Sequence, residues 1–326
     1  SFVQFTFPHP ATDWAANYEA ALACFVECIA AVSQFTKVLV VCEDPISTKA
    51  YLHQIPTTQL RLVSLPSNDT WARDHGGITI WEDGKAVVLD FQFNAWGLKF
   101  AADKDNRITR RLHKQQIFET ATLRTLNFVL EGGSIESDGQ GTLLTTSQCL
   151  LAPNRNPQFE RADIEQYLTE IFGLKRILWL ENGALAGDDT DAHIDTLARF
   201  CNPNTIAYVQ CQDPKDTHYT SLQKMEAELQ AFHTTDGKPY QLFPLPFPDA
   251  IFDANGNRLP ATYANFLITN ESVVVPTYGV PQDEIAMAVI QSIFPDRTVV
   301  GVNCHPLLVQ GGSLHCVSMQ YPTYAY

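Results

Sequence analysis

Gly133-Ser-Ile-Glu-Ser-Asp-Gly-Gln-Gly-Thr-Leu-Leu-Thr145 shows the repeating unit of this chain most clearly. Its two apolar segments, joined by an Asp-Gly turn, predict a β-hairpin. The same order of strand, turn and strand occurs at residues 77–89 and again at residues 265–276. A pattern that returns at a regular interval indicates that the fold repeats one small unit around a centre.

Helical and strand patterns alternate between and beyond these hairpins. Apolar spacing predicts helices at residues 11–35 (with Asp13 as the N-cap), 158–172, 220–232 and 283–294. Apolar, often β-branched runs predict strands at residues 38–41, 86–91, 143–151, 177–180, 272–275 and 298–302. No linker-like or low-complexity stretch interrupts this alternation. We therefore expect an α/β fold and a single domain over residues 1–326.

Composition narrows the class of protein. The formal net charge of −14 disfavours binding to nucleic acid or to an anionic membrane, and it is compatible with a cationic substrate. No apolar run approaches the roughly 20 residues of a membrane-spanning helix, and residues 1–10 lack a secretory pattern. Eight scattered cysteines suggest reduced thiols in the cytoplasm. No metal-binding motif is present, so we expect neither a metal nor a cofactor. A homo-oligomer is compatible with these features.

Four polar segments, three of which contain glycine, carry the candidate chemistry: residues 68–77, 130–133, 188–195 and 310–316. Their key residues are Asp74, Glu131, His193 and Cys316, which are separated by 57, 62 and 123 residues. A repeat of about 60 residues would place these side chains at equivalent points around one axis. The gap between His193 and Cys316 is about twice as long as the others, so it contains one further repeat. The equivalent position of that repeat falls near Asn265.

The motifs Trp-x-Arg-Asp, Glu-Gly-Gly, His-x-Asp and Gly-Gly-x-x-His-Cys, in this order, resemble the agmatine deiminase and bacterial-type peptidylarginine deiminase family. The resemblance extends from Pro8 to Pro322. It implies the pentein fold, a five-bladed α/β propeller of ββαβ modules. This agrees with the sequence, because five repeats of about 60 residues fit in a chain of 326 residues. One local difference is His75-Gly-Gly77, where many agmatine deiminases have Thr-Gly-Pro.

The resemblance also implies roles for individual residues. Cys316 would be the nucleophile, and His193 the general acid and base. Asp74 and Asp195 would hold a substrate guanidinium, with Glu131 as a further carboxylate. The remaining implied site residues are Trp71, which would stack near the substrate, Asn265, and the Gly311-Gly312 pair, which lets the backbone approach the site.

Elementary chemistry makes the same demands on such a site. A guanidinium is always charged and presents a planar fork of N–H groups, which carboxylates bind through paired hydrogen bonds. A cysteine thiol of pKa about 8.5 is mostly protonated at neutral pH, and a nearby histidine and the bound cation both favour the thiolate. The thiolate would attack the guanidine carbon, His193 would protonate the leaving ammonia, and water would then hydrolyse the thiouronium.

Several other residues have competing interpretations. Asp189 and Asp191 are either turn residues or contacts for the distal cation of the substrate. We expect His315 to point away from Cys316 along a strand and to have a structural role. Cys304 is the rival thiol, and its apolar context favours the core.

The leading hypothesis for function is the hydrolysis of agmatine to N-carbamoylputrescine and ammonia. A deiminase of peptidyl-arginine or free arginine, and an amidinotransferase, are alternatives on the same fold. A thiol peptidase that uses Cys316 and His193, and a guanidine-binding module without catalysis, are alternatives from other classes.

Overall fold

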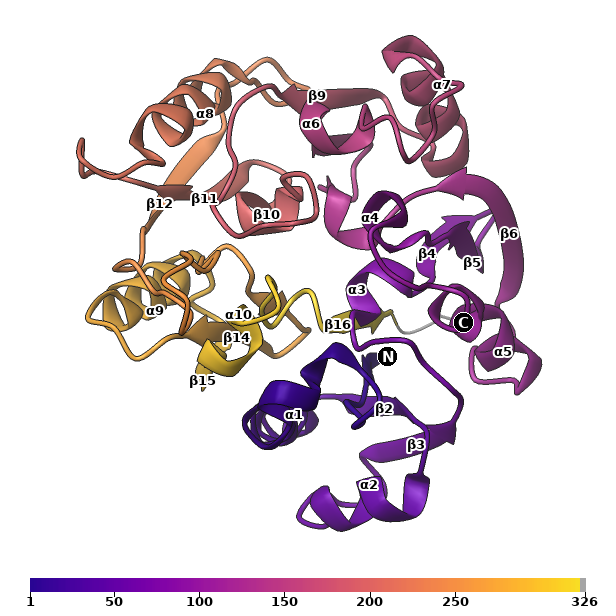
Figure 1. The fold of residues 1–326 in the computed structure, drawn as a ribbon. Coiled ribbons are helices and arrows are strands. Elements are labelled where there is room, and N and C mark those ends of the chain that lie inside the picture. The colour runs from indigo at the N-terminus through magenta and orange to yellow at the C-terminus, as the bar shows by residue number, and fades with distance from the viewer. Residues whose placement is uncertain (323–326) are drawn as a thin grey trace.

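Five small β-sheets surround a common axis in the computed structural model, which describes residues 1–322 (Figure 1). In four of the sheets an antiparallel hairpin is followed by a helix and by a third strand that runs parallel to the second. Their strands are β4 (Ile78–Glu82), β5 (Lys85–Gln92) and β6 (Thr122–Val129); β7 (Ile135–Ser137), β8 (Thr142–Thr146) and β9 (Arg176–Leu180); β10 (Ala198–Asn202), β11 (Thr205–Gln210) and β12 (Gln241–Pro246); and β13 (Leu267–Ile268), β14 (Ser272–Thr277) and β15 (Thr298–Asn303). The helices between the second and third strands are α5 (Ile108–Lys114), α7 (Arg161–Phe172), α8 (Tyr219–Ala231) and α9 (Gln282–Ile293).

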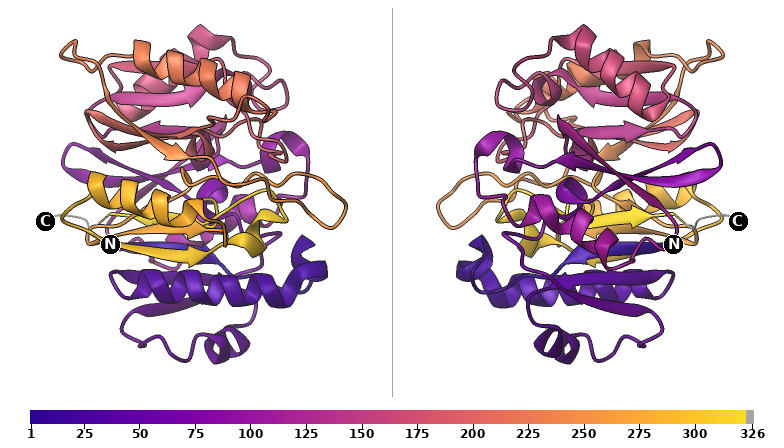
Figure 2. Two further views of the ribbon diagram at one scale, coloured as in Figure 1. Left: turned by 90° about the vertical axis from the view of Figure 1, so that its left-hand side faces the viewer. Right: turned by 90° about the vertical axis from the view of Figure 1, so that its right-hand side faces the viewer.

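The fifth sheet joins the two ends of the described chain. Strand β16 (Ser318–Tyr321) pairs antiparallel with β1 (Phe2–Thr6) near the two ends of the chain (Figure 2). In this pairing Phe2 lies opposite Tyr321. Helix α1 (Tyr18–Ser33) then leads to β2 (Lys37–Cys42), parallel to β1, and α2 (Pro45–Tyr51) leads to an extra parallel strand, β3 (Leu60–Ser64). Each blade is thus a ββαβ module, and the fold is the predicted five-bladed α/β propeller.

The second strands of the hairpins are covered on both faces. In β14, for example, Val273, Val274 and Val275 have no exposed surface. A strand that is buried on both faces needs apolar side chains at successive positions, which explains why these strands appear in the sequence as continuous apolar runs. The long helices α1, α7, α8 and α9 lie on the outer side of the ring (Figure 1).

Two predicted elements differ from the structure. The strand expected at residues 143–151 ends at Thr146, because the Thr146 side chain accepts a hydrogen bond from the Cys149 backbone N–H and caps the short helix α6 (Ser147–Leu150). The helix expected from residue 11 begins with the 3₁₀ turn η1 (Asp13–Asn17), whose N-cap is Thr12 and not Asp13.

The span Asp13–Ser33 corrects the expectation about apolar runs. It is long and apolar enough to cross a membrane by length and composition alone. Its inward face, however, packs in the propeller core, where Phe25, Cys28 and Ile29 are fully buried. The predicted single domain over residues 1–326 includes residues 323–326, which lie outside the described part of the chain.

Candidate active site

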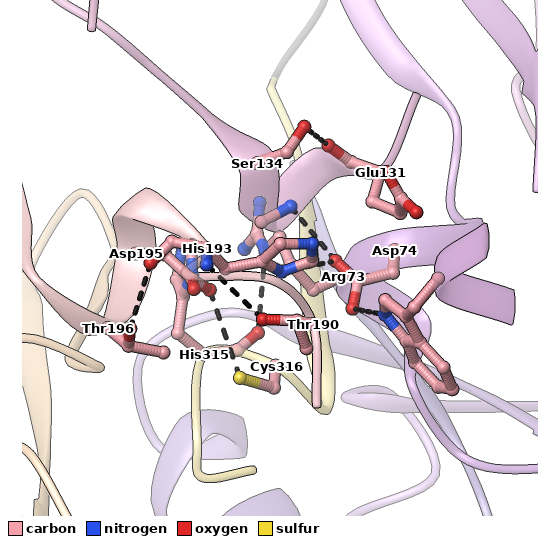
Figure 3. A network of polar contacts seen from close by, with 12 residues as sticks. Arg73, Asp74, Glu131, Ser134, Thr190, His193, Asp195, Thr196, His315 and Cys316 are labelled. Atoms are coloured by element: carbon pink, nitrogen blue, oxygen red, sulfur yellow. Dashed lines mark hydrogen bonds and ion pairs between the residues drawn. The ribbon is translucent and has the colours of Figure 1, made fainter. Parts of the chain in front are cut away.

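The predicted site residues lie at equivalent points of the five blades. Asp74 lies just before β4, Glu131 before β7, His193 and Asp195 before β10, Asn265 before β13 and Cys316 before β16. The chain enters each blade near the axis, through a short turn in three cases: α3 (Ala72–His75), η3 (Gly132–Ser134) and η4 (Ile194–Thr196). This placement explains the spacing of about 60 residues, and it brings the side chains together at the centre (Figure 3).

Asp74 is held from two sides. The Gly133 backbone N–H donates to Oδ1 at 2.9 Å, and the Trp96 indole N–H donates to Oδ2 at 3.0 Å. Burial raises the pKa of Asp74 well above its usual range, and the nearby Asp195 carboxylate raises it further. Gly133 must be glycine for this packing, because a Cβ there would lie 2.6 Å from His193 Nδ1 and 2.8 Å from Asp74 Oδ1.

Asp195 receives a hydrogen bond through a chain that begins at Arg199. Arg199 Nη2 lies 3.0 Å from His315 Nε2, and His315 Nδ1 lies 2.7 Å from Asp195 Oδ2. Since the guanidinium can only donate, Nε2 accepts and Nδ1 carries the proton toward Asp195. The other carboxylate oxygen, Oδ1, is buried without a hydrogen-bond partner among the described residues. Burial raises the pKa of Asp195 to about 7, against the opposing effect of Arg199.

The expectation that His315 points away from the site is wrong. The segment before β16 is a turn and not a strand: the Val317 N–H donates to the Ser313 carbonyl, and the Ser318 N–H donates to the His315 carbonyl. The turn directs the side chains of both His315 and Cys316 toward Asp195. His315 is therefore a positioning residue for this carboxylate.

Cys316 is held in place by Asn265, the residue at the equivalent position of the repeat between His193 and Cys316. Asn265 Oδ1 accepts from the backbone N–H groups of His315 and Cys316 at 2.8 and 3.2 Å, and it lies 3.4 Å from the Cys316 sulfur. The sulfur is 3.9 Å from Asp195 Oδ2. Burial raises the pKa of the Cys316 thiol well above its usual range, and the carboxylates of Asp195 and Asp74 raise it further. This environment favours the protonated thiol over the thiolate.

His193 is almost fully buried, and neither of its ring nitrogens has a hydrogen-bond partner among the described residues. Its Nδ1 lies 3.7 Å from Asp74 Oδ1. Burial lowers the pKa of His193 well below its usual range, and the positive charges of Arg155 and Lys99 lower it further. A neutral, unpartnered imidazole in such a place can take up or release a proton for a bound molecule.

Glu131 lies behind His193 and does not contact the cavity. Arg155 Nε is 2.9 and 3.0 Å from its two carboxylate oxygens, and both side chains are fully buried. The same guanidinium contacts Asp191 at 2.7 Å, and Lys99 contacts Asp191 at 2.9 Å. Both carboxylates are thus committed to ion pairs, and neither reaches the substrate space directly.

A cavity of about 380 Å³ leads from the surface to Asp74 and Cys316. Its mouth and walls carry three further carboxylates, Asp13, Asp69 and Asp189, and no lysine or arginine of residues 1–322 lines it. Its other lining residues are Ala16, Asn17, Trp71, Trp96, Phe100, Gly187, Thr190, Val309, Gln310, Gly311 and Gly312. Asp195 and His193 are buried just beyond its inner end. The cavity therefore favours an elongated cation.

The predicted Gly312 and Trp71 depend on each other. A Cβ on Gly312 would lie 2.1 Å from the Trp71 ring, so the indole can line the cavity only beside glycine.

The unusual His75-Gly-Gly77 segment lies on the opposite side of Asp74, where His75 is buried and 3.2 Å from Thr6 Oγ1. His75, Gly76 and Gly77 do not line the cavity.

Trp96, Arg155 and Arg199 were not identified from the sequence. Trp96 lies in α4 (Ala95–Leu98), where every residue has a positive φ, a rare conformation for residues other than glycine. Asn94 and Gly97, directly after the apolar run of β5, are the local signal for such a turn. The two arginines give no local signal, because their partners are distant along the chain. Arg155 binds Glu131, 24 residues away, and the partners of Arg199 are 63 or more residues away.

Known proteins of one family are similar to this chain over nearly its whole length. The family model described as Porphyromonas-type peptidyl-arginine deiminase matches residues 1–322. An agmatine deiminase of Pseudomonas aeruginosa is 32% identical over 339 residues, which cover 97% of this chain and 91% of the relative.

Two solved structures are closely similar. One is described as a "putative arginine deiminase" from Porphyromonas gingivalis; it is 51% identical, with a TM-score of 0.93 over 99% of this chain and 96% of its own. The other is a cysteine-to-serine variant of C. jejuni agmatine deiminase with substrate bound; it is 41% identical, with a TM-score of 0.92 over 98% of this chain and 92% of its own.

Proposed function

The chain belongs to the Porphyromonas-type peptidyl-arginine deiminase family and is a guanidine-hydrolysing enzyme, and on this premise we propose that it converts agmatine and water to N-carbamoylputrescine and ammonia. The observation that carries the choice of substrate is the charge of the cavity. Carboxylates lie at its inner end and at its mouth, and no lysine or arginine of the described residues lines it. Agmatine has a cation at each end. Free arginine carries a carboxylate that this acidic mouth would repel.

In the proposed complex, the guanidinium lies between Asp74 and Asp195. Oδ1 of Asp195 is buried without a hydrogen-bond partner in the described part of the chain, and it is available for an N–H group of the substrate. Asp74 is oriented by Gly133 and Trp96. The positive charge of the substrate favours the ionised form of both carboxylates, whose pKa values are raised in the empty site.

The same cation prepares the nucleophile. Burial and the two carboxylates raise the pKa of the Cys316 thiol and so favour its protonated form. A guanidinium placed against the sulfur reverses the local charge and favours the thiolate. His193, whose ring nitrogens have no hydrogen-bond partner among residues 1–322, accepts the thiol proton. The thiolate forms a C–S bond to the guanidine carbon, giving a tetrahedral adduct.

The adduct then loses ammonia. The protonated His193 donates its proton to the departing nitrogen, the C–N bond breaks, and a thiouronium remains on Cys316. Neutral His193 next takes a proton from water, and the resulting hydroxide adds to the same carbon. The C–S bond then breaks, the hydroxyl loses its proton to the released ammonia as the ureido C=O forms, and His193 returns its proton to the Cys316 sulfur. Asp195, positioned by His315, stays near the carbon throughout. Glu131 and Arg155 fix the surroundings of His193.

The test is a substrate panel of agmatine, free arginine and peptidyl-arginine, read by ammonia release and ureido formation. We expect turnover of agmatine at the highest kcat/KM, and its loss in Cys316→Ala. Preferential turnover of peptidyl-arginine would contradict the proposed substrate and leave the reaction type intact. Formation of a new guanidine on an added amine, without ureido product, would instead identify an amidinotransferase.

A further inference from the structure

Three cysteines that the proposed reaction does not use converge on one point of the core. Cys24 and Cys28 lie one turn apart on the inward face of α1, and Cys304 is the N-cap of α10 (His305–Leu308), directly after β15. Their exposed fractions are 3, 0 and 0%. The sulfur of Cys28 lies 4.0 Å from that of Cys24 and 4.0 Å from that of Cys304, and all three atoms lie within 4.8 Å of one another.

This geometry fits a metal ion in the plane of three sulfur ligands. At a metal–sulfur distance of about 2.3 Å, an ideal trigonal site has sulfur atoms about 4.0 Å apart. Two edges of the observed triangle already have this length. A disulfide does not fit, because its sulfur atoms are about 2.05 Å apart and all three cysteines are free.

The donor set selects the kind of ion. Thiolates are soft ligands that favour Cu(I) among the biological metals, whereas Zn²⁺ nearly always takes four ligands. Among residues 1–322, no histidine, aspartate, glutamate or fourth cysteine joins the group. The ordinary alternative is that the thiols simply fill the core as small apolar side chains. Convergence of three sulfur atoms from two separate elements is not needed for that purpose.

We propose that Cys24, Cys28 and Cys304 form a trigonal binding site for one soft, thiophilic metal ion, with Cu(I) as the biological representative. The site is distinct from the catalytic centre. The ion would join α1 to the start of α10, two elements that already pack together in the core. Cys24 alone of the three retains some exposed surface.

The test is anaerobic titration with Cu(I) in competition with the chelator bicinchoninate. All variants carry Cys316→Ala, so that the catalytic thiol cannot bind the probe. We expect this background protein to hold one equivalent of Cu(I), and Cys28→Ala to lose it. Cys211→Ala removes a buried thiol that belongs to no such group, and this control should retain the full equivalent.

Two further measurements keep the outcome decisive. Circular dichroism shows whether Cys28→Ala folds; if it does not, Cys24→Ala, at the edge of the group, takes its place. X-ray absorption of the loaded background protein should show three sulfur ligands at about 2.3 Å. The proposal would be overturned if the folded Cys28→Ala or Cys24→Ala variant retained as much Cu(I) as the background protein. A spectrum with fewer than three sulfur ligands would overturn it as well.

Discussion

Replacing Gly133 by alanine tests the packing of the catalytic groups in a single step. The new Cβ would lie 2.6 Å from His193 Nδ1, 2.8 Å from Asp74 Oδ1 and 3.2 Å from Asp195 Oδ2. An ordinary contact begins at 3.4 Å, so the imidazole must retreat by about 0.8 Å. A misplacement of about 1 Å can cost about 100-fold in rate. We therefore expect kcat/KM for agmatine to fall by roughly 30- to 100-fold, or about 2–3 kcal/mol.

The assay is steady-state ammonia release, together with urea denaturation to measure folding. Overpacking typically costs about 1–3 kcal/mol, so the variant should still fold. The matched control is Gly301→Ala in β15, where the nearest atoms are the side chains of Thr277 and Met287 at 3.1 Å or more. The control should keep its kcat/KM. Full activity in Gly133→Ala would refute the claim that these three groups act from their observed positions.

Three further predictions address single groups. Trp96→Phe removes the N–H donor to Asp74, so kcat/KM should fall about 10- to 100-fold, as expected for a hydrogen bond to a charged group; Trp179→Phe removes a similar bond to Glu165, away from the site, and an equal loss there would contradict this role. His315→Phe removes the donor to Asp195, so the acidic limb of the kcat/KM profile should move to higher pH, and an unmoved limb would leave His315 a merely structural residue. Burial raises the pKa of Asp195 from 3.8 to about 7, so its contribution to the stability of the folded state is complete below about pH 4 and is lost as the pH rises to 7. The urea midpoint of the wild type should therefore fall relative to that of Asp195→Asn over this pH interval. Parallel midpoint curves for the two proteins would show that Asp195 does not titrate there.

The periodic part of the site could be predicted from the sequence. Each blade begins near the axis, so equal spacing along the chain becomes nearness in space. This relation pointed to Asn265, whose local sequence contains no recognisable motif. It also grouped Asp74, His193 and Cys316, although the chain separates them by many residues.

The parts that were missed depend on local turns or on contacts across the ring. A turn, and not a strand, precedes β16, and this single difference brings His315 beside Asp195. Trp96 reaches Asp74 from a left-handed turn that apolar periodicity does not describe. Cys28 and Cys304 are 276 residues apart, and only the packing of α1 against α10 brings their sulfur atoms together.

The central claim is that the Cys316 sulfur attacks a guanidine carbon held by Asp74 and Asp195. The most direct measurement is mass spectrometry of peptides from enzyme that is acid-quenched during turnover of agmatine. We expect an adduct equal to agmatine less one ammonia on the peptide that contains Cys316, and no adduct in Cys316→Ser. Steady ammonia release without any adduct, or an adduct on another cysteine such as Cys149, would contradict it.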